Sequence, residues 1–503
     1  MHGTLRRLLT LGLLTCALTL IAPSTTAWAK ASSTIEVKIQ TSEVLSLFYM
    51  AESITRHPSR STYLRDIYEA KRGDKLDVEA SLSQVFMTAP TGIKFHEQSH
   101  NLPPERHSGQ NYADILEIMA LQSTDLDDFI DRTRALMPVS AHARFAADMR
   151  ALDPLHREHV WEPSKDFLAN AKLELERARS KYKMEALLQR ISTFYGSDWP
   201  SSEPIIIGLI PVPGKREAAV SYAHSAGAYE FVEVLDHDNT DSRFGVLIHE
   251  LCHSLYEAQP PSLQIEQSEW FRESKTLSAY LAATEINEAV ATAIGNGWVE
   301  ADIQGQDVMK LPWYNDPVID KFSKAIYPHI KAYLEQGKRW DKELNDKMIE
   351  AFREAFPESF RSTMFVFQDI AIFEDTKSKL EDSRDTRGLF RRVRSVRYSR
   401  PVEHPMSIKA YDEAQTSTSI FLLGQKNARR LKSYPFYKKH RKRIDAALAR
   451  KKPFYWATRD TPDKRLVVIV GLGGLKSVRS IYEELARPDL ITLDKVITLP
   501  TRE

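Results

Sequence analysis

The sequence predicts an α+β protein that is mostly helical, with a small sheet before its central helix and a smaller α/β domain near its C-terminal end. Three observations predict this class. Apolar residues follow helical spacing over much of residues 30–375, and apolar strand patterns gather just after residue 200. After residue 376, short apolar strands alternate with helical patterns.

Composition sets the limits of the fold. The 503 residues are 42% hydrophobic and 27% charged, which is typical of a globular chain with a large core. The net charge of +1 disfavours nucleic acid as the main partner, because that role usually needs a strongly basic face. We divide the chain into residues 1–29, 30–200, 201–375 and 376–503.

Residues 1–29 have the features of a signal peptide. Arg6 and Arg7 are basic, residues 8–21 are apolar, and Ala27-Trp28-Ala29 fits a cleavage site. The apolar run is too short to span a bilayer. The segment resembles a bacterial Sec signal, so we expect a secreted or periplasmic protein. Cys252 is then the one remaining cysteine, expected to be a small buried residue.

The region before the central helix is predicted to be largely helical. Residues 33–40 alternate like an edge strand, and helical spacing follows at residues 112–119 and 126–136. Residues 167–195 give the clearest helix. We interpret all of these as scaffold.

Two strands are predicted next, at residues 204–213 and 219–235, joined by the turn Pro213-Gly214. A sheet beside the central helix offers an edge to which an extended peptide can bind through backbone hydrogen bonds. His224 is expected to be a structural or surface residue.

The central helix carries the pattern His249-Glu250-x-x-His253. Histidines four residues apart project from one helical face, so both imidazoles can reach one metal ion. Glu250 lies about 100° round the helix from His249, within reach of a water bound to that ion. We expect Asp241 or Ser242 as N-cap and a buried apolar stripe at Phe244, Leu247, Ile248, Leu251 and Leu255.

A second helix is expected from about residue 268 to residue 293, ending near Gly295 and Gly297. Its helical phase places Glu288 among small side chains that let two helices approach closely. Glu288 is therefore the favoured third ligand. Glu285, one turn earlier, is the alternative.

His249-Glu250-x-x-His253 followed by Asn287-Glu288-x-x-Ala291 resembles the gluzincin class of zinc metallopeptidases, over residues 200–350. The resemblance implies a zincin-like metallopeptidase domain in residues 201–375. It also implies one Zn²⁺ held by the two histidines and the glutamate, with a fourth position left for water.

In the hydrolysis that this resemblance implies, zinc lowers the pKa of its water from about 15.7 to about 7. Glu250 is then the general base, which takes the proton and delivers it to the leaving amine. A tyrosine would stabilise the negative oxygen. Tyr314 in a loop is the candidate, and Tyr327 is the alternative. Residues 316–356 are otherwise expected to be helical, with core positions at Ile319, Phe322, Ile326, Ile330 and Tyr333.

The C-terminal region begins after a charged run at residues 375–387, which indicates a boundary. Strands are predicted at residues 417–423 and 465–470. Residues 471–474 are expected to form a strand-to-helix turn, since the full G-x-G-x-x-G spacing is missing. Residues 425–452 contain 12 Lys or Arg and one acid. We interpret them as a solvated helical face, with an anionic envelope surface as the alternative.

The sequence therefore predicts a secreted zinc-dependent peptidase that acts on a peptide or protein. Two alternatives stay open. One is a non-catalytic envelope binding or scaffold protein with a peptidase-like fold, and the other is a zinc hydrolase of cell-wall peptides.

Overall fold

The computed structural model describes residues 35–55, 62–73, 77–88, 112–200, 203–214, 222–236, 240–374, 390, 392–399, 401–413, 417–424, 428–459, 463–473, 475 and 477–499. The chain divides into two units, Met1–Thr34 and Ile35–Glu503, and every described residue belongs to the second. The expected signal peptide, residues 1–29, lies outside the described residues. No helix among the described residues combines the length and hydropathy that crossing a membrane requires.

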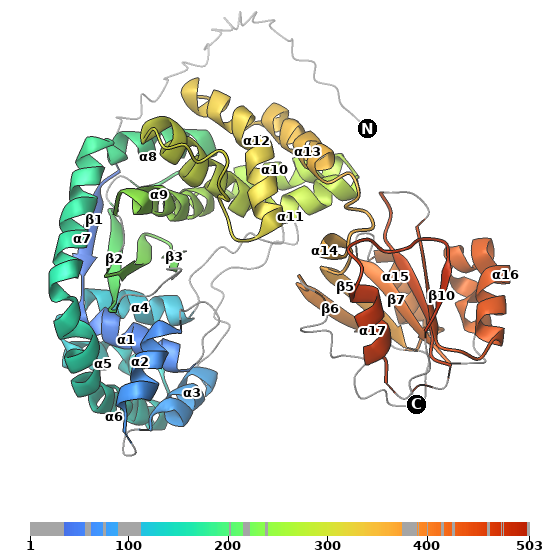
Figure 1. The fold of residues 1–503 in the computed structure, drawn as a ribbon, viewed down its shortest axis with the longest axis horizontal. Coiled ribbons are helices and arrows are strands. Elements are labelled where there is room, and N and C mark those ends of the chain that lie inside the picture. Colours follow the sequence, from blue (N-terminus) through green and yellow to red (C-terminus); the bar gives the residue numbers. More distant parts are fainter. Residues whose placement is uncertain are drawn as a thin grey trace, which may run out of the picture. The chain divides into compact units, whose positions relative to one another are not determined.

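The first part of the described chain is mainly helical (Figure 1). Its elements are β1 (Val37–Thr41), α1 (Glu43–Ile54), α2 (Tyr63–Lys71), α3 (Glu79–Thr88), α4 (Tyr112–Gln122), α5 (Leu126–Thr133), η1 (Arg134–Leu136), α6 (Val139–His156), η2 (Arg157–Trp161), α7 (Glu162–Lys181), α8 (Met184–Tyr195), β2 (Ile205–Val212), β3 (Ala223–Ala226), β4 (Tyr229–Leu235), α9 (Thr240–Glu257), α10 (Pro261–Glu273), α11 (Leu277–Thr292), η3 (Ala293–Ile303), α12 (Pro317–Glu335), α13 (Lys342–Ala355) and α14 (Thr363–Val366). The segments η2 and η3 are π-helical.

A four-stranded sheet has the order β1-β2-β4-β3. The central strand β2 pairs in parallel with β1 and β4, whereas β3 pairs antiparallel with β4. β1 therefore lies at one edge, as the pattern at residues 33–40 predicts, and β3 lies at the other. The mixed, mostly helical architecture confirms the predicted α+β class.

The prediction for the two strands before the central helix is only half right. β2 matches residues 204–213, but residues 219–235 contain a hairpin in which β3 and β4 meet at Gly227 and Ala228. Gly227 has a φ of 65°, which glycine adopts without strain. Because β2 and β4 are parallel, Pro213-Gly214 is not a hairpin turn. Residues 215–221 lie outside the described residues.

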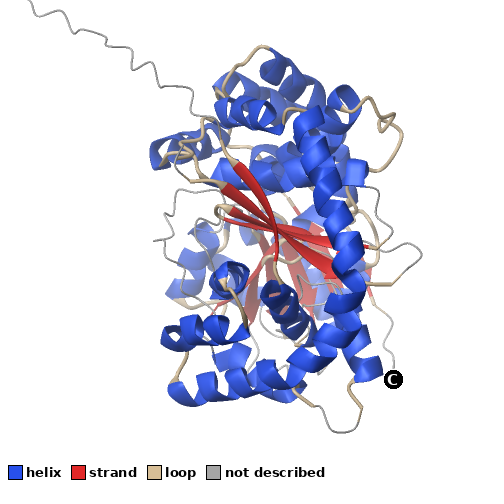
Figure 2. Cartoon of the chain, turned by 90° about the vertical axis from the view of Figure 1, so that its left-hand side faces the viewer, coloured by secondary structure: helices blue, strands red, loops and turns tan. Residues whose placement is uncertain are grey.

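Helices cover both faces of this sheet (Figure 2). On one face, Ile205, Ile207 and Leu209 of β2 pack in a core with α7, α8 and α9. On the other face, Ile210 and Phe231 pack with α1, α4 and α6. Successive strand residues point to opposite faces, so the apolar run of β2 serves both cores. The sheet thereby fixes one side of α9.

Two long predicted helices are each broken in the structure. The single helix expected at residues 167–195 is α7 followed by α8, with Lys183 at φ 51° between them. The helix expected at residues 268–293 is α10 followed by α11, with Lys275 at φ 52° at the break. No glycine or proline marks either break, which is why helical spacing alone missed them.

A six-stranded sheet forms the C-terminal part, in the order β10-β8-β9-β7-β5-β6. Its elements are β5 (Asp369–Glu374), β6 (Ser395–Ser399), α15 (Pro405–Glu413), β7 (Thr418–Leu423), η4 (Ala428–Ser433), α16 (Pro435–Ala449), β8 (Phe454–Thr458), β9 (Val467–Gly471), α17 (Arg479–Ala486) and β10 (Val496–Thr498). α17 packs on one face and α15 and α16 on the other. The α/β prediction and its strands β7 and β9 are confirmed.

The predicted boundary at residue 375 needs correction. β5 ends at Glu374, before that boundary, yet it pairs with β6 and β7 inside the C-terminal sheet. The charged residues 375–387, which suggested the boundary, lie outside the described residues. They follow the first strand of this sheet in the chain and do not precede it.

The basic stretch at residues 425–452 is centred on α16. Its aromatic residues Tyr434, Phe436 and Tyr437 are buried in the core of the C-terminal sheet, while Lys438 and Lys442 are exposed. The aromatic side chains are thus occupied by packing. An anionic envelope surface as the partner of these lysines stays a prediction.

Candidate metal centre

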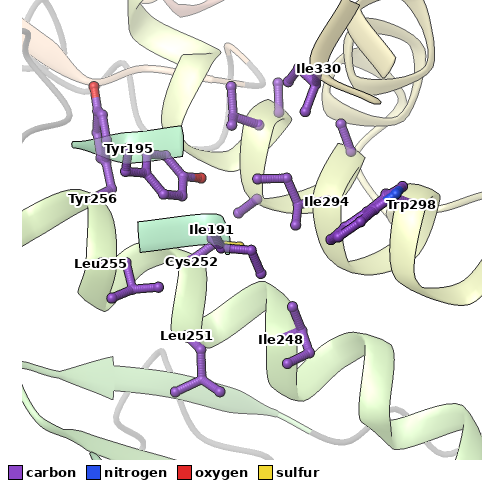
Figure 3. Packing of buried hydrophobic residues seen from close by; sticks show 14 of the residues in the cluster. Ile191, Tyr195, Ile248, Leu251, Cys252, Leu255, Tyr256, Ile294, Trp298 and Ile330 are labelled. Atoms are coloured by element: carbon purple, nitrogen blue, oxygen red, sulfur yellow. The ribbon is translucent and has the colours of Figure 1, made fainter. Parts of the chain in front are cut away.

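The apolar face of the central helix α9 packs into the core of the protein. All five positions of the predicted stripe are buried in one core: Phe244, Leu247, Ile248, Leu251 and Leu255. Figure 3 shows Ile248, Leu251 and Leu255 among buried side chains of neighbouring elements. Cys252 is also buried, as predicted, and burial raises the pKa of its thiol. The helix begins at Thr240, so Asp241 and Ser242 lie inside it and are not its N-cap.

The opposite side of α9 carries His249 and His253, and α11 supplies Glu288. The two Nε2 atoms lie 3.2 Å apart. One carboxylate oxygen of Glu288 lies 3.5 Å from His249 Nε2, and the other lies 3.6 Å from His253 Nε2. Among the described residues, these three form the one group of histidine, cysteine and acidic side chains arranged to hold a metal ion.

A polar side chain contacts the far ring nitrogen of each histidine. His253 Nδ1 lies 3.0 Å from Asn287 Oδ1, which only accepts, so this nitrogen carries the proton. His249 Nδ1 lies 3.5 Å from the hydroxyl of Thr292, which can either donate or accept a hydrogen bond. Both Nε2 atoms face the carboxylate of Glu288. Partners of this type orient metal-binding histidines and raise their basicity.

The carboxylate of Glu288 is ionised. Burial alone would raise its pKa, but His253, His249 and the Tyr314 hydroxyl lower the pKa to about 2. Two-fifths of the side chain, 41%, is exposed, whereas Oε2 itself is inaccessible and has no hydrogen-bond partner among the described residues. The exposed part is therefore the rest of the side chain, and Oε2 is directed inward.

The alternative ligand Glu285 is occupied elsewhere. Its carboxylate forms an ion pair with Arg392 at 2.7 Å and accepts a hydrogen bond from Gln368 at 3.0 Å. It lies 6% exposed, on the side of α11 turned toward those two residues. Glu285 is thus excluded as the third member of the histidine group.

The two candidate tyrosines are also separated by their contacts. The ring of Tyr314 stacks on His249, with centroids 5.9 Å apart, and its hydroxyl hydrogen-bonds Glu288. Tyr327 is 8% exposed, packs edge-on against Trp313 at 5.4 Å, and donates its hydroxyl to Asp302. Tyr314 is therefore the tyrosine at the metal group, and Tyr327 is a packing residue.

Glu250 lies beside this group on α9. Burial raises its pKa to about 7, against a lowering effect of His253, and the charge of Glu288 adds to the rise. The structure thus brings together all five residues that the sequence singled out, from α9, α11 and the loop before α12.

His224 lies away from this group. It contacts the buried Glu117 at 2.9 Å and stacks on Phe231. Its predicted structural role is confirmed.

Comparisons of this chain with protein-family models, curated proteins and solved structures find no match. The gluzincin resemblance therefore rests on the motif and on the geometry above.

The arrangement passes a geometric test for a tetrahedral ion. Zinc bonds to nitrogen and carboxylate oxygen are about 2.0–2.2 Å, and tetrahedral angles then place neighbouring ligand atoms about 3.3–3.5 Å apart. The two Nε2 atoms, 3.2 Å apart, fall close to that range, and each carboxylate oxygen of Glu288 lies at 3.5 or 3.6 Å from one of the two nitrogens. Two imidazoles and one carboxylate also suit zinc, with a fourth position available. The residues present fit the ion.

Sequence reasoning missed how η3 approaches α9. Gly295 and Gly297 were expected to end a helix, yet both lie inside η3. A Cβ added at Gly295 would lie 2.5 Å from the carbonyl oxygen of Gly245 and 2.8 Å from His249 Cβ. Only a residue without a side chain permits this contact. Glycines inside two helical segments were the available signal, because glycine is unfavourable there unless a close approach requires it.

We expect purified protein to bind one Zn²⁺, and Glu288→Gln to weaken that binding by more than the roughly 10- to 100-fold that loss of a ligand's hydrogen-bond partner costs. Glu285→Gln is the matched control, because it makes the same change one turn away and should keep wild-type affinity. Zinc content and competition titration with a chelator measure both. Equal affinities of the two variants would contradict the ligand assignment.

Gly295→Ala should also weaken zinc binding, because the new methyl group pushes η3 away from the backbone that carries His249. Gly305→Ala is the control. Its Cβ meets open space, so this variant carries only the strain of a φ of 73° and should keep its zinc affinity. Thermal unfolding and chelator competition together separate loss of stability from loss of affinity.

Proposed function

We propose that this protein is a zinc-dependent peptidase of the gluzincin type, with a zincin-like domain that begins near residue 201 and ends before β5. The observation that carries the proposal is the convergence of two imidazole Nε2 atoms and an ionised carboxylate, with Glu250 beside them. When bound there, zinc supplies a Lewis acid and lowers the pKa of water.

Glu250 supports a hydrolytic role. A general base works best when its pKa lies near the working pH, because it must both accept and return a proton. Burial raises the pKa of Glu250 to about 7, which meets that condition. Glu250 is the base that takes a proton from water and gives it to the leaving amine.

Tyr314 supplies the hydrogen-bond donor. Burial and the neighbouring Glu288 carboxylate raise the pKa of its hydroxyl, so the proton stays on the oxygen at neutral pH. A donor held beside the metal group stabilises negative charge that develops on the substrate oxygen. The stacking on His249 restricts the position of the Tyr314 ring.

The sheet supports a peptide as the substrate. β3 lies at the end of the sheet order, and it packs against α9. An extended peptide can add to such an edge through backbone hydrogen bonds, which places its carbonyl groups near the helix that carries the histidines. Proteins, peptides and cell-wall peptides all present this backbone.

The proposal includes export, with the protein secreted or periplasmic. It is supported by the basic residues, apolar run and cleavage-site pattern of residues 1–29. A non-catalytic envelope scaffold is the competing function. The two differ in whether Glu250 has a chemical role.

We expect Glu250→Gln to lower peptide hydrolysis by at least about 10²- to 10⁴-fold, since this removes the proton acceptor and leaves the zinc ligands in place. Zinc content should stay near one ion. Exposed Glu158→Gln is the matched control and should cleave like wild type. Cleavage is measured on a peptide mixture by mass spectrometry. A wild-type protein that holds zinc but cleaves nothing would favour the scaffold.

Tyr314→Phe should lower kcat by about 10²- to 10³-fold with little change in KM, because the hydroxyl acts on charge that develops during the reaction. Tyr327→Phe makes the same change at the packing tyrosine and should leave kcat close to that of wild type. Zinc titration of both variants checks that the metal group is intact. A drop confined to Tyr327→Phe would contradict the assignment.

A further inference from the structure

One acidic side chain next to the metal group has no part in the chemistry above. Glu300 lies on η3, and its side chain packs directly over Gly245 of α9. A Cβ at Gly245 would lie 2.5 Å from Glu300 Cγ, so the missing side chain is what lets the carboxylate rest on the helix. Gly245 precedes His249 by one turn, about 5.4 Å, and faces within about 40° of it.

Glu300 is therefore on the histidine-bearing side of α9, one turn from the metal group. Val246, which lies about 60° round the helix from His249, is partly exposed, as is Glu300 itself. Consecutive residues of an extended peptide are about 3.3–3.6 Å apart. A peptide whose reacting carbonyl lies at the metal group thus has a neighbouring side chain within reach of Glu300.

The carboxylate of Glu300 has no cationic partner among the described residues. Its side-chain hydrogen bond comes from the neutral amide of Asn296, at 3.3 Å. Burial raises the pKa of Glu300 to about 7, because no lysine or arginine compensates for the lost solvent. A cationic group on a bound ligand would stabilise the ionised form of a half-buried acid of this kind.

We propose that Glu300 is a specificity-determining residue that binds the lysine or arginine side chain of a substrate, within two residues of the bond that is cleaved. The proposal rests on the peptidase function proposed above and adds the charge class of its substrate. The recognition is an ion pair between the Glu300 carboxylate and an ammonium or guanidinium group. Glu300 takes no part in the proton transfers.

The test uses decapeptides of alanine and leucine in which one lysine, arginine, norleucine or glutamate is placed at each position in turn. Cleavage rates are measured for zinc-loaded full-length wild type, Glu300→Gln and the exposed-site control Glu158→Gln. Binding of the same peptides is measured by fluorescence anisotropy on Glu250→Gln and on the double variant with Glu300→Gln. Zinc content and thermal unfolding of every variant are recorded alongside.

We expect wild type and Glu158→Gln to prefer lysine or arginine over norleucine by about tenfold at one position, the effect of one charged hydrogen bond. Glu300→Gln should reduce that preference to within about twofold, with unchanged zinc content. Glutamine has nearly the shape of glutamate and can occupy the same place over Gly245. If the Glu300→Gln variant loses the preference for lysine or arginine, the negative charge of Glu300 is therefore the cause.

Other outcomes separate this inference from the proposed function. Cleavage without a basic preference, or with a preference that Glu300→Gln retains, overturns the inference and leaves the peptidase standing. Binding of basic peptides that depends on Glu300, without cleavage by wild type, supports the subsite and contradicts catalysis. Peptides neither bound nor cleaved overturn both.

Discussion

The structure depends on holding two imidazole nitrogens and a carboxylate oxygen within 4.8 Å of one another. Two imidazole lone pairs and a carboxylate repel each other at that distance, and the repulsion is strong where solvent is excluded. A bound cation removes this repulsion. In its absence, packing elsewhere must hold the helices together.

That packing involves the apolar face of α9 opposite the histidines and the contact between α9 and η3. The buried back of α9 sits between the sheet and neighbouring helices, and each fully buried apolar side chain contributes roughly 1.5–3 kcal/mol. Beside it, the glycines at positions 245 and 295 allow η3 to lie against α9 at backbone distance. π-helical segments often occur at functional sites. Here the π-helical segment η3 contains Gly295, which lies against the backbone of α9. The position of α9 and the close approach of η3 are thus set by residues outside the group of His249, His253 and Glu288.

The sequence predicts the centre of this arrangement better than its surroundings. The His249 motif and the small residues of α11 were enough to choose Glu288 over Glu285. The relative angular positions of residues around a helix do not depend on where the helix begins or ends, so errors in the predicted ends did not affect this choice. The breaks at Lys183 and Lys275 were missed because nonglycine residues adopt positive φ there under tertiary constraint. Thr292 and Gly295 were missed because their roles exist only between two segments. β5 was assigned to the wrong domain because strand partners distant in sequence are not visible in a local pattern.

Two carboxylates near the same histidines differ in the direction of their pKa shifts, and that difference supports the roles proposed for them. Against the effect of burial, His253, His249 and Tyr314 lower the pKa of Glu288 to about 2, so it stays anionic as a ligand must. Glu250 is partly exposed, and burial of part of its side chain raises its pKa to about 7. Environments that push the pKa values of two neighbouring acids apart in this way are typical of a pair in which one acid keeps its charge and the other transfers protons. A site that only stored a metal would need the first acid and would have no use for the second.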